Sequence, residues 1–399
     1  MGTEQPRAVI TAACRTPIGT ARKGTLTETT AEELAGHVVT NVVKRSGLSP
    51  EVFDDLVLGE VYQGGGDIAR YVAAANGLTS IPGMAVNRQC ATGLTAVASA
   101  AATIMSGMGD AVIAGGTEAA SMSPVGRRRT PGTSGKNADD WTDPWFSPSH
   151  PGTPDAPAMD MSITVGWNAA VQYDITRQQQ DEWAARSHER AIAAIDDGRF
   201  DSEIVPITVT NKAGETVDFA VDEHPRRGTN LEVLSGLRVI HPEIEGFSVT
   251  AGNSSGINDA AAALTVVSDG LAKAEGLETL GVIRSWSAVG VEPNRTAIGP
   301  TIAIPRALAR AGLSLRDVRL FDINEAFAAQ VIACTKVLEL DEDRVNVSGS
   351  GISLGHPIAA TGARMATTMV YELRRLGGGI GVIAMCAGGG MGAAMVIEV

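Results

Sequence analysis

The chain has 399 residues, of which 44% are hydrophobic, only 4% are aromatic and 46 are glycine. This length predicts roughly two or three domains, and the low aromatic content favours an α/β protein over a β-sandwich. The net charge of −13 and the sequence pI near 5.0 argue against a nucleic-acid binder, because phosphate binding needs a basic surface.

The cysteines and the N-terminus limit the class further. The four cysteines, which lie at positions 14, 90, 334 and 386, form no CxxC pair and no zinc spacing with histidine, so neither disulfides nor a metal site are expected. MGTEQPRAVI has no signal-peptide pattern, and Pro6 breaks a myristoylation match, so a cytoplasmic protein is predicted. The uncharged stretch 90–109 could span a bilayer by length, but its Ala, Ser, Thr and Gly content predicts a buried helix without membrane insertion.

The first 120 residues alternate between strand-like and helix-like patterns. RAVITAACRTPIG predicts a strand that enters a loop, TETTAEELAGHVVTNVVKRSGL predicts an amphipathic helix, and DDLVLGEVYQ predicts another strand. The helix at 90–109 and the apolar strand DAVIAGGTEAA follow. Such alternation is typical of parallel strands covered by helices.

Residues 121–160 are rich in Pro, Gly, Asp, Ser and Trp without any periodicity, which predicts a functional cover or a small subdomain. The run Arg127, Arg128 and Arg129 within it is interpreted as a solvated loop. Next, Thr176 is the predicted N-cap of a helix that ends at Gly198. His188, which lies among charged residues of this helix, is expected on the surface.

The second half of the chain repeats a pattern of the first. ATGLTAVASAAA and AVIAGG follow Cys90, whereas AATGARMATT and GVIAMCAGGG follow His356. The spacing is 20 residues from Thr92 to Val112 and 21 from Thr361 to Val382. We infer two copies of a strand–helix–strand unit, with chance similarity of Ala- and Gly-rich segments as the alternative.

Two residues stand at predicted helix starts. Cys90 lies where a strand-like run turns into a helix, and the helix dipole with its unpaired N–H groups is expected to lower the pKa of the thiol. A nucleophile follows, with an inert core cysteine as the alternative. His356, in SGSGISLGHPIAATGAR, could deprotonate a thiol or simply begin a helix.

Two more segments carry candidate residues. Cys386, in VIAMCAGGGMGAAMVIE, precedes glycines whose N–H groups could hold an oxyanion, although a structural glycine hairpin has the same pattern. Asn324 opens NEAFAAQVIA after a strand-like run. It is either the N-cap of a helix or a side chain that positions a water or a carbonyl oxygen.

Together these segments resemble the thiolase family over nearly the whole chain. The motifs NRQCATGL, AGGTEAASMSP, TAGNSSGINDAAAAL, NEAFAAQ, GHPIAATGAR and CAGGGMG stand in family order and at family spacing. The resemblance implies two similar βαβαβαββ halves that form a five-layered α-β-α-β-α core, with an inserted loop domain. It places the N-terminal half at 1–120 plus about 249–275, the loop domain at 121–248 and the C-terminal half at 276–399. A homodimer or homotetramer is also implied.

The resemblance also implies a covalent mechanism. Cys90 attacks the keto carbon of a 3-ketoacyl-CoA after His356 takes its proton, and Cys386 protonates the departing enolate. Asn324 holds a water that binds the enolate oxygen together with His356. The N–H groups of Cys90 and Gly388 bind the oxygen of the tetrahedral adduct.

Coenzyme A contacts follow from the same resemblance. Ser255 matches a serine that contacts pantetheine, and Arg226 matches an arginine near the nucleotide phosphate. The run at 127–129 could be a further phosphate contact in the cover. No cofactor is expected besides CoA and acyl-CoA as substrates.

The sequence departs from the family pattern at several positions. Short-chain acetoacetyl-CoA enzymes carry His-Met-Gly where this chain has Asp160, Met161 and Ser162, while Ala359 and Met391 replace a usual glycine and a frequent glutamine. A degradative 3-ketoacyl-CoA thiolase is therefore expected, and GSGISLGHP is similar to thiolases of bulky acyl chains. The alternatives are a biosynthetic acetoacetyl-CoA thiolase and a catalytically silent CoA-binding subunit. A ketoacyl-synthase-like enzyme would need a Cys-His-His set.

Overall fold

The computed structural model describes residues 5–130, 132 and 141–399. Residues 1–4 belong to the N-terminus from which the absence of a signal peptide was predicted, and they lie outside the described residues. So do residues 131 and 133–140 of the irregular stretch 121–160. The helices are α1 (Ala31–Ser46), α2 (Ile68–Ala75), α3 (Thr92–Met105), α4 (Asn168–Gln172), α5 (Arg177–Asp196), α6 (Leu231–Ser235), α7 (Asp269–Ala274), α8 (Gly299–Arg310), α9 (Ala328–Leu338), α10 (Gly351–Leu354) and α11 (Thr361–Arg375). Short 3-10 helices are η1 (Pro50–Val52), η2 (Ala120–Met122), η4 (Pro293–Ile298), η5 (Leu315–Asp317) and η6 (Glu342–Arg344), and η3 (Ser162–Trp167) is a π-helix.

One large sheet and one small hairpin hold the strands together. The strands are β1 (Ala8–Arg15), β2 (Gly19–Thr20), β3 (Asp55–Gly59), β4 (Gly83–Val86), β5 (Ala111–Ala119), β6 (Ile207–Thr210), β7 (Thr216–Phe219), β8 (Asn258–Ser268), β9 (Gly281–Gly290), β10 (Val318–Ile323), β11 (Ile380–Ala387) and β12 (Met391–Glu398). The large sheet runs β10-β11-β12-β9-β1-β8-β5-β3-β4, with β2 beside β8, while β6 pairs with β7.

The sheet is mixed rather than parallel throughout. Strands β4, β3 and β5 are parallel, as are β10 and β11, because helices connect them. The expectation of parallel strands in the first 120 residues is wrong for β1, which pairs antiparallel with β8 and β9. Strand β5 also has an antiparallel neighbour in β8, and β12 pairs antiparallel with β9 and β11. A short antiparallel pairing of β1 with β9, from Ala8↔Ile283 to Ile10↔Gly281, joins the two halves of the sheet.

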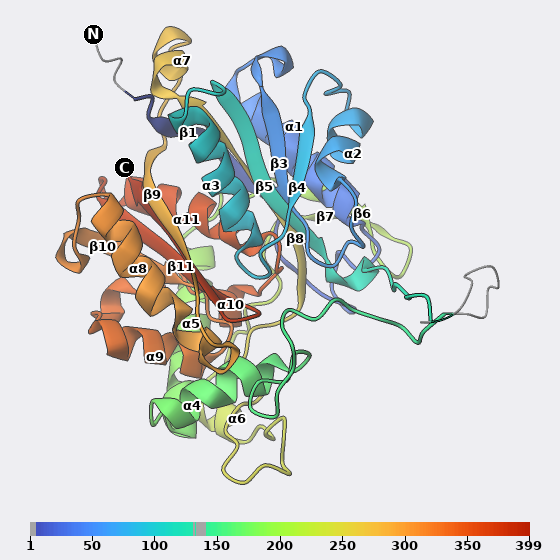
Figure 1. Cartoon of the computed structure of the whole chain (residues 1–399), viewed down its shortest axis with the longest axis vertical. Coiled ribbons are helices and arrows are strands. Elements are labelled where there is room, and N and C mark those ends of the chain that lie inside the picture. Colours follow the sequence, from blue (N-terminus) through green and yellow to red (C-terminus); the bar gives the residue numbers. More distant parts are fainter. Residues whose placement is uncertain (1–4, 131, 133–140) are drawn as a thin grey trace.

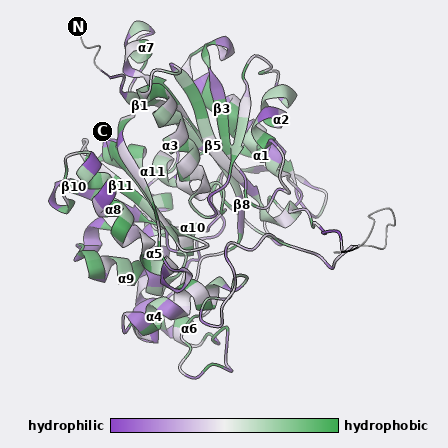
Figure 2. Ribbon diagram, viewed as in Figure 1, coloured by the Kyte–Doolittle hydropathy of each residue, from purple (hydrophilic) through white to green (hydrophobic). Residues whose placement is uncertain are grey.

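Helices cover both halves of the sheet in five layers (Figure 1). Helices α1 and α2 pack on the outer face of the N-terminal half, and α8 and α9 pack on the outer face of the C-terminal half. Helices α3 and α11 lie together between the halves, where one buried cluster joins side chains of both. Figure 2 shows hydrophobic residues concentrated in the strands, as this burial requires. The predicted five-layered core and the buried helix at 90–109 are confirmed.

Glycines allow α3 and α11 to approach each other at their first turns. A Cβ atom on Gly362 would lie 2.2 Å from the backbone nitrogen of Leu94, and one on Gly93 would lie 2.7 Å from the carbonyl oxygen of Ala359. Neither position has room for a side chain, because the obstructing atoms belong to backbone. The backbones just before the two helices are therefore brought side by side, and this junction contains Cys90 and His356.

Between β5 and β8 the chain leaves the sheet and forms the predicted helix α5. Thr176 caps α5 in a reciprocal capping box with Gln179, and Gly198 with φ 68° follows its end, as predicted. The prediction for His188 is wrong, since its side chain is only 5% exposed and its Nδ1 accepts the N–H of Arg226 at 3.2 Å. The segment around residue 226 covers this face of α5, a long-range contact that the local charge pattern does not reveal.

The arginine run lies in an exposed extension of this excursion (Figure 1). The guanidinium of Arg128 stacks over Trp145 at 3.4 Å from the ring centroid, and Arg129 stacks over Trp141 at 3.9 Å. The interpretation as a solvated loop is confirmed. Within residues 5–130, 132 and 141–399, no helix combines the length and apolarity that a bilayer crossing needs, and no group of three His, Cys, Asp or Glu side chains could hold a metal ion.

Candidate active site

Cys90 stands in a sharp turn between β4 and α3, just before the first residue of the helix. Gln89 has φ 48°, a left-handed conformation that is uncommon for a residue with a side chain. Thr92 stabilises this turn, because its Oγ1 accepts the Arg88 N–H at 2.7 Å and donates to the Gln89 carbonyl at 2.6 Å. Cys90 is partly exposed, whereas Cys14, Cys334 and Cys386 are buried.

The environment of the Cys90 sulfur contains opposing effects. Burial raises the pKa of Cys90 to about 11, although hydrogen bonds from the backbone N–H groups of Gly388 and Cys90 lower it. The expectation of a lowered pKa is therefore wrong, since desolvation outweighs the helix start. Cys90 rests as a thiol and needs a base when it attacks, and the two N–H groups point at its sulfur.

His356 lies in the loop before α11 and is only 6% exposed. Its Nδ1 is 2.7 Å from the Thr361 Oγ1, and this hydroxyl donates its single proton to the Pro357 carbonyl at 2.8 Å. Thr361 must therefore accept from Nδ1–H, which leaves Nε2 unprotonated. Burial lowers the pKa of His356 to about 3, with a smaller contribution from Arg364, so the imidazole is neutral.

Asn324 follows β10 and faces His356 from the C-terminal sheet. Its Nδ2 lies 3.5 Å from the His356 Nε2, and its backbone N–H donates to the Ala384 carbonyl at 2.9 Å. The side chain is fully buried, and among the described residues its Oδ1 has no hydrogen-bond partner. The N-cap interpretation is wrong, because α9 begins only at Ala328. A buried acceptor without a partner is a place for a water or a substrate group.

Cys386 is the penultimate residue of β11 and is 2% exposed. The glycines after it form a hairpin to β12, with φ 92° at Gly389 and 80° at Gly390, so the structural reading of these glycines holds beside the chemical one. Burial, then the Cys90 and Cys334 sulfurs, raise the pKa of Cys386 well above its ordinary value, and the thiol keeps its proton. A Cβ on Gly388 would lie 3.7 Å from the Gln89 Cγ, which shows that this hairpin packs against the Cys90 turn.

The two residues predicted to contact CoA lie on neighbouring segments. Ser255 donates its backbone N–H to the Ala326 carbonyl at 3.0 Å, so it lies against the Asn324 loop. Arg226 has an exposed side chain. It follows His224, whose ring would be 2.3 Å from a Cβ on Gly256. The fold thus brings both segments beside the loops that carry the reactive groups.

Sequence reasoning missed three side chains that organise this site: Thr361, Glu325 and Glu118. Glu325 accepts four hydrogen bonds, from Trp183 Nε1 (2.9 Å), Asn346 Nδ2 (2.9 Å), Ser187 Oγ (2.6 Å) and Ile352 N (3.2 Å), and so holds the Asn324 loop against α5 and α10. Glu118 is the one acid in the apolar strand AVIAGGTEA, and that isolated charge was a signal in the sequence.

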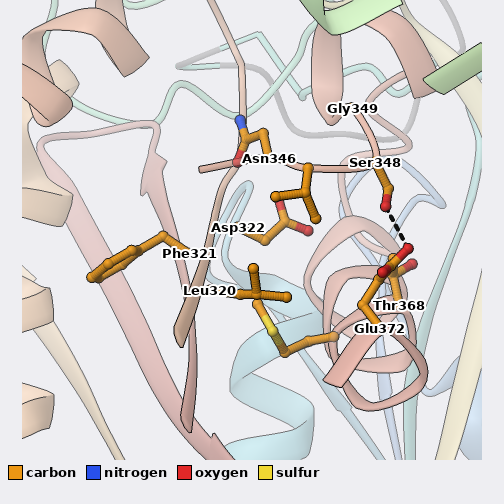
Figure 3. A pocket seen from close by; sticks show the side chains of 10 residues that line it. Leu320, Phe321, Asp322, Asn346, Ser348, Gly349, Thr368 and Glu372 are labelled. Atoms are coloured by element: carbon orange, nitrogen blue, oxygen red, sulfur yellow. Dashed lines mark hydrogen bonds between the residues drawn. The ribbon is translucent and has the colours of Figure 1, made fainter. Parts of the chain in front are cut away.

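A cavity of about 20 Å³ is lined by none of the candidate site residues described above (Figure 3). Side chains of β10, α11 and the loop 346–349 enclose it, and Ser348 donates to Glu372 across it at 2.6 Å. The volume suffices for about one water molecule, so the cavity cannot hold an acyl chain.

Comparison with known proteins identifies the family. The model of the thiolase N-terminal domain matches residues 8–270, and that of the thiolase C-terminal domain matches residues 277–399. A peroxisomal 3-ketoacyl-CoA thiolase of Arabidopsis thaliana is 40% identical over 98% of this chain and 85% of its own, and an acetyl-CoA acetyltransferase of Pseudomonas aeruginosa is 40% identical over 98% of each. The crystal structure of a Bacillus anthracis acetyl-CoA acetyltransferase superposes with a TM-score of 0.88 at 39% identity over 99% of both chains. The chain therefore belongs to the thiolase family of acyltransferases.

Proposed function

We propose that this thiolase is a degradative 3-ketoacyl-CoA thiolase, an acetyl-CoA C-acyltransferase that cleaves a 3-ketoacyl-CoA with CoA. The observation that carries the reaction type is the convergence on one junction of a partly exposed thiol at Cys90, an unprotonated Nε2 at His356 and a protonated thiol at Cys386. Nucleophile, base and acid are then three different groups, each in the required protonation state.

In the first half-reaction the Cys90 sulfur forms a bond to the C3 carbonyl carbon of the substrate as His356 Nε2 accepts the thiol proton. The N–H groups of Cys90 and Gly388 stabilise the resulting oxyanion. The C2–C3 bond then breaks, and its electron pair becomes the enolate of acetyl-CoA. His356 and a water bound to Asn324 stabilise this enolate, and Cys386 protonates its C2.

In the second half-reaction the thiol of a new CoA loses its proton to the Cys386 thiolate and attacks the acyl-Cys90 thioester. The Cys90 thiolate leaves and recovers its proton from His356, which restores the starting state. This sequence predicts ping-pong kinetics, because the acyl enzyme persists between the two CoA molecules. Ser255 and Arg226 are the proposed pantetheine and phosphate contacts.

The degradative direction rests on the loop beside η3. Asp160 stands where the short-chain enzymes carry histidine, and its Oδ2 bonds to the Nε2 of His241 at 2.8 Å. The acid is thus used within the protein and cannot replace the histidine of those enzymes. The Pseudomonas relative is named an acetyl-CoA acetyltransferase, which supports the alternative of a biosynthetic acetoacetyl-CoA thiolase.

The remaining assignments are proposals of the same kind. We place the N-terminal half at 1–120 plus about 249–275, the loop domain at 121–248 and the C-terminal half at 276–399. The protein is proposed to act in the cytoplasm as a homodimer or homotetramer on CoA thioesters, without a resident cofactor.

Intact-protein mass spectrometry after mixing with a panel of 3-ketoacyl-CoAs of increasing chain length tests this function. We expect an acyl adduct at Cys90 whose mass increases with the chain length of the substrate, and we expect the adduct to disappear when CoA is added. An adduct from acetyl-CoA and acetoacetyl-CoA alone would favour the biosynthetic alternative. No adduct from any substrate would favour a silent CoA-binding subunit.

A further inference from the structure

Glu118 is a fully buried acid near the end of β5, in a strand that is otherwise uncharged. A buried carboxylate is costly unless several donors solvate it. Here the donors are neutral: Gln63 Nε2 (2.7 Å) and Tyr62 N (3.3 Å) bind Oε1, and Ala359 N (3.1 Å) binds Oε2. We call these four residues the Glu118 cluster.

The Glu118 cluster connects the segments that carry the nucleophile and the base. Ala359 follows His356 in the loop before α11, and its carbonyl oxygen packs on Gly93 in the first turn of α3. The same peptide segment therefore touches the Cys90 helix through its oxygen and Glu118 through its nitrogen. On the other side, Glu118 accepts the backbone N–H of Tyr62, whose phenol lies close enough to Cys90 that an ionised thiol there would add to the effect of burial on the Tyr62 pKa.

Tyr62 and Gln63 lead into a run of three glycines. Gly64, Gly65 and Gly66 follow with φ of 92°, 82° and 116°, and a Cβ on either of the last two would meet nothing within 4 Å. This glycine run gives the segment little packing of its own. Glu118 supplies a fixed attachment for it beside the reactive thiol.

We propose that Glu118 is a positioning residue of the thiolase reaction, which fixes the His356 loop and the Tyr62–Gln63 segment around the Cys90 sulfur. This inference rests on the proposed function. The ionised form is the active one, because a carboxylate accepts all three N–H groups without needing a proton. Its charge adds to the larger effect of burial, and both oppose ionisation of Cys90.

The pH dependence follows from the groups that face Glu118. These are Tyr62 from the loop after β3, Asp259 from β8 and Cys90 from the turn before α3, and only the backbone N–H of Ala359 faces it from the His356 loop. Burial raises the pKa of Glu118 to about 7. Glu118 is therefore ionised above this pH, and kcat is expected to fall as the pH decreases through the Glu118 pKa.

Glu118→Gln is the decisive variant, because its amide cannot accept from both Gln63 and Ala359 while presenting two donors of its own. We expect kcat to fall about 10–100-fold with a small change in KM for CoA, and the decline of kcat near pH 7 to disappear. In contrast, the pH midpoint for alkylation of Cys90 by iodoacetamide should move down by about 0.5–1 unit, since a nearby negative charge is gone. A loosened site would also expose the thiol and slow turnover, so a variant that keeps the charge of Glu118 is needed to separate the two causes.

Two further variants keep the proposal testable. Glu118→Asp retains the charge, but its shorter side chain cannot accept hydrogen bonds from both Gln63 and Ala359. The alkylation midpoint of this variant should therefore stay near that of the wild type while kcat falls. Glu60→Gln, a change of a buried acid at the start of the same loop, should leave both measurements unchanged. Thermal melting of each protein checks the fold.

An unchanged alkylation midpoint in Glu118→Gln, or full kcat with the same pH profile, would overturn the proposal. The alkylation measurement needs no substrate. If the wild type acylates with no 3-ketoacyl-CoA, the proposed function fails, yet the shift in midpoint still decides whether Glu118 acts on Cys90.

Discussion

Cys90 and His356 occupy corresponding places in the two halves of the molecule, each shortly before a helix of the central layer, but their surroundings differ. Cys90 is partly exposed, and its sulfur accepts the backbone N–H groups of Gly388 and Cys90. His356 is buried, and its ring contacts Thr361 and Asn324 while its backbone binds Asn258. The N-terminal half thus presents the atom that reacts, and the C-terminal half supplies the network that fixes the proton transfers.

The largest loss of activity is expected from a change of Cys90, the partly exposed residue of the two. Cys90→Ser should lower thiolysis by about 10³-fold or more, because serine is a far weaker nucleophile near neutral pH. Steady-state kinetics and intact mass of the acyl enzyme measure this loss. Cys14→Ala, which changes a buried cysteine distant from the junction, should keep its turnover. Full thiolysis by Cys90→Ser would reject Cys90 as the acyl carrier.

A smaller loss of activity is expected when Asn324 is removed from the hydrogen-bond network around His356. Asn324→Ala removes the support of one enolate-stabilising donor and should slow deuterium exchange at C2 of acetyl-CoA by about 10²–10³-fold. Alkylation of Cys90 in the same protein should be unchanged, because the nucleophile belongs to the other half. If the exchange rate and the alkylation rate fall together, the roles of Asn324 and Cys90 are coupled, in contradiction to the division proposed above.

A change that affects the tautomer of His356 is expected to have a smaller effect, but it tests a single hydrogen bond. Thr361→Val removes the hydroxyl that accepts from Nδ1–H, and kcat is expected to fall about 10–100-fold as Nε2 loses its fixed role. The unpaired Nδ1–H should also cost about 1–3 kcal/mol of folding free energy. Thr361→Ser should restore most of kcat. Failure of serine to restore it would mean that the methyl group, not the hydroxyl, is required.

The smallest effect concerns the His241–Asp160 pair, which lies apart from both sides. A hydrogen bond to Glu243 and the charge of Asp160 raise the pKa of His241, while hydrogen bonds from Ser162 and His241, with the charge of His241, lower the pKa of Asp160 against the effect of burial. The pair is charged above the pKa of Asp160 and below the raised pKa of His241. Its stabilisation is therefore lost as the pH rises through the latter value.

An NMR titration of the His241 ring measures this effect. In Asp160→Asn the pKa of His241 should fall towards its ordinary value, with little change in kcat. An unchanged titration would show that Glu243 alone sets the ionisation of His241. A large loss of kcat would instead connect this pair to the catalytic junction.

The sequence by itself determined the elements and the reactive residue types. Local patterns predicted α1, the buried α3 and the capped α5, since periodicity and capping residues act within a few residues of each other. The order of six motifs predicted the family, the five layers and the set of Cys90, Asn324, His356 and Cys386. The acid in the apolar strand β5 was visible too, although nothing local indicated its partners.

Tertiary structure decided the protonation and the contacts of these residues. Burial raises the pKa of Cys90 where the helix start predicted a decrease, and a segment distant in sequence buries His188. Thr361 fixes the tautomer of His356, and Glu118 reaches Ala359 across 241 positions of the chain. Desolvation and long-range hydrogen bonds depend on which segments meet, and this information is absent from any single stretch of sequence.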